Sequence, residues 1–274
     1  MKTIINFCPT GMIPTKSINK NTPISPSEIV EQTHEAFELG ITSVHLHARL
    51  HNEKPTFEKD VYRKIIEGVR KHCPKLIICC STSGRDFPSF NQRSEVIELS
   101  PDMCSLTLSS LNFIKSASIN APDMIQSLLE KMIRFGVNPE LECFDLGMIN
   151  YGKYLLKKMN ITSPSYWNII FGNIAGIQPT FSQIGAAISQ VPEDHFISLG
   201  GIGEYQLMTN SLAITSGLGV RVGLEDNIWY DKNKQIKASN IMLLKRIHQL
   251  IEINQKELMS STELGLYNKK NERK

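Results

Sequence analysis

The chain alternates short, continuous apolar runs with longer stretches in which apolar residues recur at a helical spacing. Residues 76–80 are a continuous apolar run, which is typical of a strand that is covered on both faces. Ser25, Pro26 and Glu28 predict a helix start, with Ser25 as N-cap, Pro26 at the first position and Glu28 closing a capping box. Gly40 predicts the end of that helix. The two kinds of stretch therefore predict strands and helices in alternation.

The same pattern continues along the whole chain. Strands are expected at 4–8, 44–49, 76–80, 103–107, 140–145, 167–171, 195–199 and 220–222. Helices are expected at 26–39, 57–71, 93–99, 123–135, 149–159, 181–190, 205–215 and 239–253. About eight such alternations without a linker predict an α/β fold, a (β/α)₈ TIM barrel, over 1–274 as one domain. A doubly wound open sheet is the alternative. A short basic tail, 268–274, is expected to be solvated.

Composition narrows the class of protein. The chain has 274 residues, a formal net charge of +3 and 41% hydrophobic residues, as in an ordinary soluble globular protein. The charge is too small, and the basic residues too scattered, to predict nucleic-acid binding. No apolar run of about 18 residues predicts a membrane span, and the start of the chain does not resemble a signal peptide. We therefore expect a cytoplasmic protein whose six cysteines are reduced and buried.

Polar residues and glycines stand where the expected strands end, which in a barrel is the catalytic face. These residues are Thr10, His47, Ser81, Thr107, Asn173, Gly201 and Glu225. His45 and His47 lie two apart on one strand, so both rings face the same side. Two imidazoles and one carboxylate are enough for a catalytic zinc. The alternative is that both are core histidines satisfied by backbone groups or by a carboxylate.

A second group of charged residues follows the last expected strand. Glu225 is a candidate metal ligand, and Asp226 is a candidate general base, because two carboxylates in different environments can hold different pKa values. Arg221 would orient Asp226 or bind a substrate carboxylate. The alternative is structural: the two acids cap a helix or pair with Arg221 and Arg49.

Three further groups of polar residues lie in or just after the expected strands. Glu140 and Glu142 share one face of a strand; Glu142, nearer the carboxyl end, is expected in the site, and Glu140 is expected to be structural. Asp145 is expected to be a helix N-cap. Hydroxyl-rich strand ends could bind a carboxylate or a developing oxyanion, or they could serve only local turns. Their residues are Ser81, Thr82, Ser83, Gly84, Ser105 and Thr107.

Taken together, these motifs resemble the β-keto acid cleavage enzyme family, whose type member acts on 3-keto-5-aminohexanoate. The matching stretches are 44–49 (VHLHAR), 81–84 (STSG), 105–113 (SLTLSSLNF), 139–145 (PELECFD), 200–203 (GGIG) and 221–227 (RVGLEDN). They occur in the family's order across nearly the whole chain. The resemblance implies a zinc-bearing (β/α)₈ barrel that forms a homotetramer.

The resemblance also implies a reaction and residue roles. The reaction is a retro-Claisen acyl exchange, in which a β-keto acid and acetyl-CoA give acetoacetate and a new acyl-CoA. His45, His47 and Glu225 would hold one Zn²⁺ per chain, acting as a Lewis acid. Asp226, steered by Arg221, would abstract a proton. The other implied site residues are Ser81 and Thr107 on the substrate carboxylate, with Ser83 and Gly84 beside them, and Glu142 completing the polar network.

Two positions depart from the family's pattern. Ser83 stands where many relatives have glycine, which would narrow the carboxylate pocket. Ile13 stands near where relatives with amino-substituted substrates carry an acid, so an uncharged or apolar β-keto acid is expected here. A metal-dependent aldolase or hydrolase that works without CoA is the alternative enzyme, and a non-catalytic metal-binding barrel is the third possibility.

Overall fold

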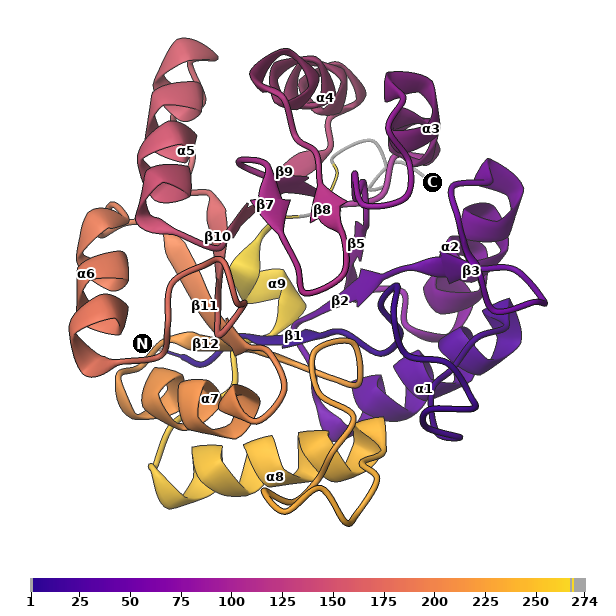
Figure 1. The fold of residues 1–274 in the computed structure, drawn as a ribbon, viewed down its shortest axis with the longest axis vertical. Helices are drawn as coiled ribbons and strands as arrows, with labels where there is room; N and C mark the ends of the chain where they lie inside the picture. The colour runs from indigo at the N-terminus through magenta and orange to yellow at the C-terminus, as the bar shows by residue number, and fades with distance from the viewer. Residues whose placement is uncertain (1, 267, 269–274) are drawn as a thin grey trace.

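The computed structural model describes residues 2–266 and 268. Within them, eight parallel strands close into a barrel in the order β1-β12-β11-β10-β9-β6-β5-β2 (Figure 1). The strands are β1 (Ile5–Phe7), β2 (Ser43–Leu46), β5 (Ile77–Cys80), β6 (Met103–Thr107), β9 (Asn138–Cys143), β10 (Tyr166–Phe171), β11 (Phe196–Gly201) and β12 (Gly219–Val222). Closure is seen at β1, where Phe7 is in register with Val222 on one side and Val44 on the other. The barrel prediction is therefore confirmed, and the open sheet is wrong.

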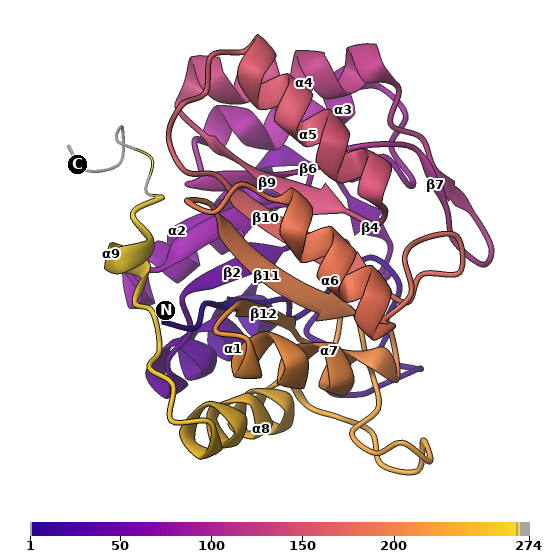
Figure 2. The ribbon, with the colours of Figure 1, turned by 90° about the vertical axis from the view of Figure 1, so that its left-hand side faces the viewer.

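Helices pack around the outside of the barrel (Figures 1 and 2). They are α1 (Pro26–Leu39), α2 (Lys59–His72), α3 (Phe90–Ser94), α4 (Pro122–Phe135), α5 (Leu146–Lys158), α6 (Phe181–Gln190), α7 (Tyr205–Thr215) and α8 (Asn240–Ile253). The helix expected at 93–99 is instead α3 followed by a 3₁₀ turn, η1 (Glu95–Leu99). In the part of the chain that the structure describes, no helix has both the length and the apolar character to cross a membrane.

Local sequence fixes the helix starts. The Ser25 hydroxyl accepts a hydrogen bond from the backbone N–H of Glu28, and the Glu28 carboxylate accepts one from the backbone N–H of Ser25. The predicted capping box is therefore confirmed. Asp145 caps α5 by accepting a hydrogen bond from the N–H of Met148 at 2.8 Å, which confirms its N-cap role. Such caps satisfy donors that the helix itself leaves free.

The N-terminal end of the barrel is closed by the end of the chain. Thr3 exchanges backbone hydrogen bonds with Glu257 and Met259, and the short helix α9 (Ser261–Leu264) lies across this end (Figure 2). Apolar side chains from the strands and from this segment pack together there. Asn268, the first residue of the expected tail, is buried; the rest of that tail lies outside the described residues.

Two antiparallel hairpins lie in the loops after the strands. The hydrophobic pattern does not indicate them. They are β3 (Ala48–Arg49) with β4 (Pro55–Thr56), and β7 (Leu111–Asn112) with β8 (Ala117–Ser118). Because the N-terminal end is closed, the space between these loops is where a ligand can enter. All six cysteines are free and buried, as expected.

Candidate active site

A cavity of about 1030 Å³ opens at the C-terminal ends of the strands. Most of the residues singled out from sequence line it: His45, His47, Ser81, Ser83, Thr107, Glu142, Arg221, Glu225 and Asp226. They come from five different strands and their loops, so the barrel brings together residues that are up to 181 positions apart in sequence, counting from His45 to Asp226. This is the end of the barrel on which (β/α)₈ enzymes carry their active sites.

His45, His47 and Glu225 converge on one point at the floor of the cavity. His45 Nε2 lies 3.2 Å from His47 Nε2, and His47 Nε2 lies 3.1 Å from Glu225 Oε1. One ligand atom from each residue falls within 4.8 Å of the others. The second oxygen of Glu225 is buried and has no hydrogen-bond partner among the described residues. Two imidazoles, one carboxylate and an unsatisfied carboxylate oxygen fit a divalent transition metal with an open coordination position.

Glycines allow Glu225 to reach this point. Gly11 has φ +65°, and a Cβ at Gly11 would lie 2.6 Å from Glu225 Cγ. Gly223 has φ +154°, and its Cβ would lie 2.0 Å from the carbonyl oxygen of Cys8. A side chain at either position would therefore collide where the ends of β1 and β12 approach each other.

Glu140 holds the His45 ring from behind. Its Oε2 lies 2.6 Å from His45 Nδ1, and its Oε1 accepts hydrogen bonds from the side chains of Asn6 at 2.7 Å and Asn168 at 3.1 Å. Burial opposes protonation of His45, but the carboxylates of Glu140 and Glu225 outweigh it and raise its pKa to about 9. Burial likewise disfavours an ionised Glu140, yet the nearby His45 lowers the pKa of that carboxyl to about 2. Glu140 therefore orients His45 so that Nε2 faces the cavity.

A second group, His45 with Cys79 and Glu140, also brings three ligand atoms together. It lies on the buried side of the His45 ring, where the Cys79 thiol donates a hydrogen bond to Glu140 Oε2 at 3.2 Å. Burial raises the pKa of the Cys79 thiol well above its ordinary value. A thiol that stays protonated is a poor metal ligand, so the His45, His47 and Glu225 group is the better metal site.

Arg221 links the carboxylates on the other side of the cavity. Its Nε donates to Asp226 Oδ2 at 2.8 Å, and its Nη2 donates to Glu225 Oε1 at 2.7 Å. Its Nη1 lies 3.5 Å from Glu142 Oε1 and has no hydrogen-bond partner among the described residues. A buried guanidinium that is surrounded by carboxylates in this way fixes their positions.

Of the three acids around Arg221, Asp226 and Glu142 have raised pKa values, which favours their neutral forms. Burial raises the pKa of Asp226 although Arg221 opposes it, and Glu225 adds to the increase. Burial and the nearby Glu140 raise the pKa of Glu142. A carboxylate whose pKa is raised toward the working pH is a better general base than an ordinary surface acid.

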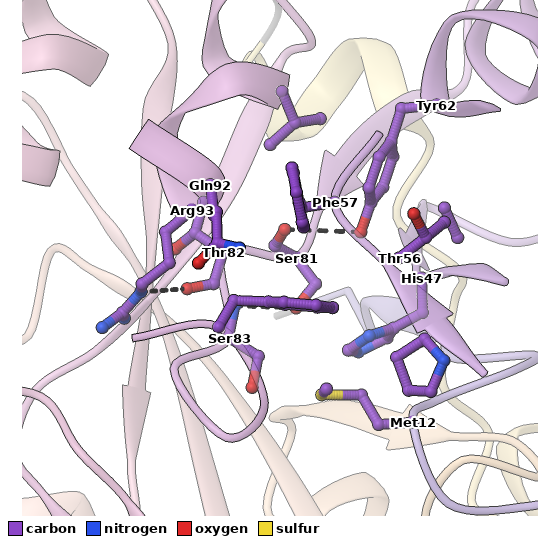
Figure 3. Close-up of a pocket in the computed structure, with 14 residues that line it drawn as sticks. Met12, His47, Thr56, Phe57, Tyr62, Ser81, Thr82, Ser83, Gln92 and Arg93 are labelled. Atoms are coloured by element: carbon purple, nitrogen blue, oxygen red, sulfur yellow. Dashed lines mark hydrogen bonds between the residues drawn. The ribbon is translucent and has the colours of Figure 1, made fainter. Parts of the chain in front are cut away.

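Hydroxyl groups lie along the wall beside β5 and β6. Thr107 Oγ1 donates to Glu142 Oε2 at 2.8 Å, so the Thr107 hydroxyl is already engaged. Ser81 Oγ accepts from the backbone N–H of Ser83 at 3.2 Å and keeps its own proton for another acceptor. A smaller pocket of about 20 Å³ lies beside this wall. Figure 3 shows Ser81, Ser83, His47 and Met12 among the residues that line it.

Gly84 lies behind this wall and not in the cavity lining. A Cβ there would lie 2.6 Å from the carbonyl oxygen of Ile119 and 2.7 Å from Arg93 Nη1. Gly84 therefore lets the loop after β5 pass close under the β7–β8 hairpin. Among the strand-end candidates from sequence in the described chain, Thr10, Thr82, Ser105 and Gly201 likewise do not line the large cavity.

Two features of the site are missed by sequence reasoning. Glu140 is expected to be structural, and it is buried, but it also contacts the His45 ring. It lies two residues before Glu142 on the same strand face, and this spacing is the signal that could have indicated the contact. Arg85 lines the cavity next to Ser83. Nothing in its local sequence indicates this, because its neighbours in space come from the distant loop at Phe113.

The fold and the site together define a (β/α)₈ barrel with a histidine–histidine–carboxylate cluster, an arginine-held acid and hydroxyl groups around one cavity. The chain belongs to the beta-keto acid cleavage enzyme family, whose model matches residues 2–265.

The relatives agree with this assignment. The chain is 34% identical to the 3-oxoadipate:acetyl-CoA acetyltransferase of Cupriavidus necator, over 91% of this chain and 88% of that protein. It is 32% identical to the 3-keto-5-aminohexanoate cleavage enzyme of Fusobacterium nucleatum, over 96% of both chains. Among solved structures, ObcA without ligand matches with a TM-score of 0.76 at 19% identity, over 89% of this chain and 64% of ObcA, which shows a shared fold.

Proposed function

We propose that the protein is a zinc-dependent β-keto acid:acetyl-CoA acyltransferase that releases acetoacetate and a new acyl-CoA. The observation that carries this proposal is the convergence of His45, His47 and Glu225 beside the Arg221–Asp226 pair in one cavity. Family membership supports the reaction type, because the relatives act with acetyl-CoA or cleave a β-keto acid. The homotetramer, the cytoplasmic location and the extent of the domain stay predictions from sequence.

His45, His47 and the Glu225 carboxylate would hold the metal. Bound there, a divalent zinc supplies Lewis-acid polarisation of a keto or carboxylate oxygen. The neutral form that His47 needs as a ligand is favoured by burial, which lowers its pKa. The chain's own residues then position the substrate and move its proton.

In the proposed exchange, one carbon–carbon bond forms at C2 of the substrate and another breaks. Asp226 takes a proton from C2 of the β-keto acid, and C2 then attacks the acetyl carbonyl carbon of acetyl-CoA and displaces the CoA thiolate. The thiolate adds to the original C3 keto carbon, the C2–C3 bond breaks with its electron pair on C2, and Asp226 returns the proton to C2. The products are acetoacetate and the new acyl-CoA.

The remaining residues have supporting roles in this proposal. Arg221 holds Asp226 within reach of C2, since two of its nitrogens point at that carboxylate. Ser81 and Ser83 donate hydroxyl protons to the C1 carboxylate of the substrate. Thr107 and Glu142 close the polar wall next to them. Gly84 contributes through the path of its loop and not through a contact with substrate.

The proposal is tested with the full chain, purified and stripped of metal with a chelator. We expect zinc to bind at about one ion per chain and to restore acetoacetate release from a panel of β-keto acids, in the presence of acetyl-CoA only. Glu225→Gln should lose both metal and activity. Acetoacetate release without any acyl-CoA would indicate a metal-dependent aldolase or hydrolase instead, and zinc binding without turnover of any β-keto acid would indicate a non-catalytic barrel.

A further inference from the structure

Arg85 is a cation that faces the active-site cavity, and no acceptor for its guanidinium lies among the described residues. It follows β5 and lines the large cavity. Its guanidinium carbon lies 3.5 Å from the centroid of the Phe113 ring, and Phe113 is in turn held edge-on by Phe144, with 5.9 Å between the ring centroids. Its Nε is buried and has no hydrogen-bond partner among the described residues. The guanidinium is therefore fixed in place by stacking and not by an ion pair.

Other arginines at this end of the barrel have acceptors for their guanidinium groups. Arg49 donates three hydrogen bonds to backbone carbonyls, and Arg93 donates to two carbonyls and the Asn120 side chain. Arg221 pairs with three carboxylates. Burial lowers the pKa of Arg85, and the charges of Glu225, Asp86 and Glu142 offset this only in part. A partly buried cation without a partner is unfavourable, so it is the kind of group that a ligand anion completes.

We propose that Arg85 binds an anionic group at the end of the β-keto acid remote from the reacting carboxylate, so that the substrate is a β-keto acid with a second acid group. This inference rests on the proposed function. The C1 carboxylate already has the Ser81 and Ser83 hydroxyls as donors on the inner wall. Arg85 stacks on the β7–β8 hairpin, and β7 lies beyond the C-terminal ends of the barrel strands (Figure 2). The guanidinium therefore lies where it could contact the outer end of a bound substrate.

Ile13 agrees with part of this proposal. It lines the same cavity and is 59% exposed, so no carboxylate at that position is available to pair with a substrate ammonium group. The proposal differs from the sequence-based expectation of an uncharged or apolar substrate, which stays a prediction. A cationic end stays disfavoured, and Arg85 favours an anionic end over an apolar one.

The test compares two straight-chain β-keto acids of equal length, one ending in a second carboxylate and one ending in a methyl group. For the unmodified protein, we expect the dicarboxylic compound to have the higher kcat/KM. Arg85→Met should lower kcat/KM for that compound by roughly 10- to 100-fold, leave the methyl-ended compound within about twofold, and leave KM for acetyl-CoA unchanged. Arg85→Lys should keep part of the preference. Lys232→Met, which removes another cation from the cavity lining, should keep all of it.

Binding gives a readout that does not need turnover. Calorimetry with the saturated dicarboxylic and monocarboxylic acids of the same length should show tighter binding of the dicarboxylic acid, lost in Arg85→Met. If that preference appears while no β-keto acid is turned over, the proposed function fails and the anion site stands.

An equal loss of kcat/KM for both substrates in Arg85→Met would place Arg85 on the C1 carboxylate, and a raised KM for acetyl-CoA alone would place it on the CoA phosphates. Either result overturns the inference, as does the absence of any preference in the unmodified protein. Thermal stability of Arg85→Met should be unchanged or higher, because the variant removes an unpaired cation.

Discussion

His45 Nδ1 lies 2.6 Å from Glu140 Oε2, and this contact turns Nε2 of the same ring toward His47 and Glu225. Glu140 is itself held by Asn6 and Asn168, so the orientation of the ring is set by fully buried groups. A carboxylate behind a metal-binding histidine fixes the tautomer and makes the facing nitrogen more basic. Glu140 is therefore a positioning residue of the proposed metal site.

We predict that Glu140→Gln weakens zinc binding by about 10- to 100-fold while the protein stays folded, since the amide keeps some hydrogen bonds but loses the charge behind His45. Competition with a chromogenic chelator measures the affinity, and circular dichroism checks the fold. Cys79→Ala is the matched control, because Cys79 contacts Glu140 but is not a proposed ligand. Loss of zinc in Cys79→Ala would instead assign the metal to the buried His45, Cys79 and Glu140 group.

Asp226→Asn should lower kcat by about 100- to 10 000-fold and leave zinc content near one per chain, because the amide preserves shape but cannot accept the C2 proton. A loss of kcat without a loss of zinc would separate proton transfer from metal binding. Steady-state kinetics and metal analysis on the same preparation measure both. If Asp226→Asn kept full kcat, the proton would have to go to another group.

Gly11→Ala should destabilise the protein by about 1–2 kcal/mol, since alanine is strained at φ +65°. The new methyl group would also press on Glu225, so zinc affinity should fall as well. Gly185→Ala on α6 is the control: apart from its chain neighbours and its own helix backbone, no atom of the described residues lies within 4 Å of the added Cβ, and the change should stabilise the helix by about 0.5–1 kcal/mol. Urea unfolding of both variants measures the difference. Unchanged zinc affinity in Gly11→Ala would show that Glu225 tolerates the displacement.

Glu98 should give a pH-dependent contribution to stability. Its carboxylate accepts hydrogen bonds from Lys131 at 2.8 Å and Lys59 at 2.5 Å, and these lower its pKa from 4.5 to about 2. Because the folded pKa lies below the unfolded one, the stabilisation is complete above about 4.5 and is lost as the pH falls toward about 2.

The test of this contribution is the difference in melting temperature between the unmodified protein and Glu98→Gln. It should correspond to less than about 1 kcal/mol at neutral pH, since Glu98 is exposed to solvent, and it should shrink below pH 4.5. A difference that grew on acidification would have the wrong sign for the assigned pairing.

Sequence predicts the features of this protein that depend on neighbouring residues. The Ser25 and Glu28 capping box, the Asp145 cap and the His45–His47 spacing are all local, and the alternation of strands and helices leads to the barrel. The Glu140 contact and the Arg85–Phe113 stack escape prediction because they join segments 95 and 28 positions apart, respectively. Such contacts depend on strand register and on loop paths, which the hydrophobic pattern does not specify.

The central claim, acyl exchange between a β-keto acid and acetyl-CoA, is tested most directly by following the acetyl carbon. Acetyl-CoA that carries ¹³C at its carbonyl carbon is incubated with the zinc-loaded protein and an unlabelled β-keto acid, and the products are observed by NMR. The proposed exchange predicts label at C3 of acetoacetate and none in the acyl group of the new acyl-CoA. Label in free acetate, or unlabelled acetoacetate formed at the same rate without acetyl-CoA, would contradict it.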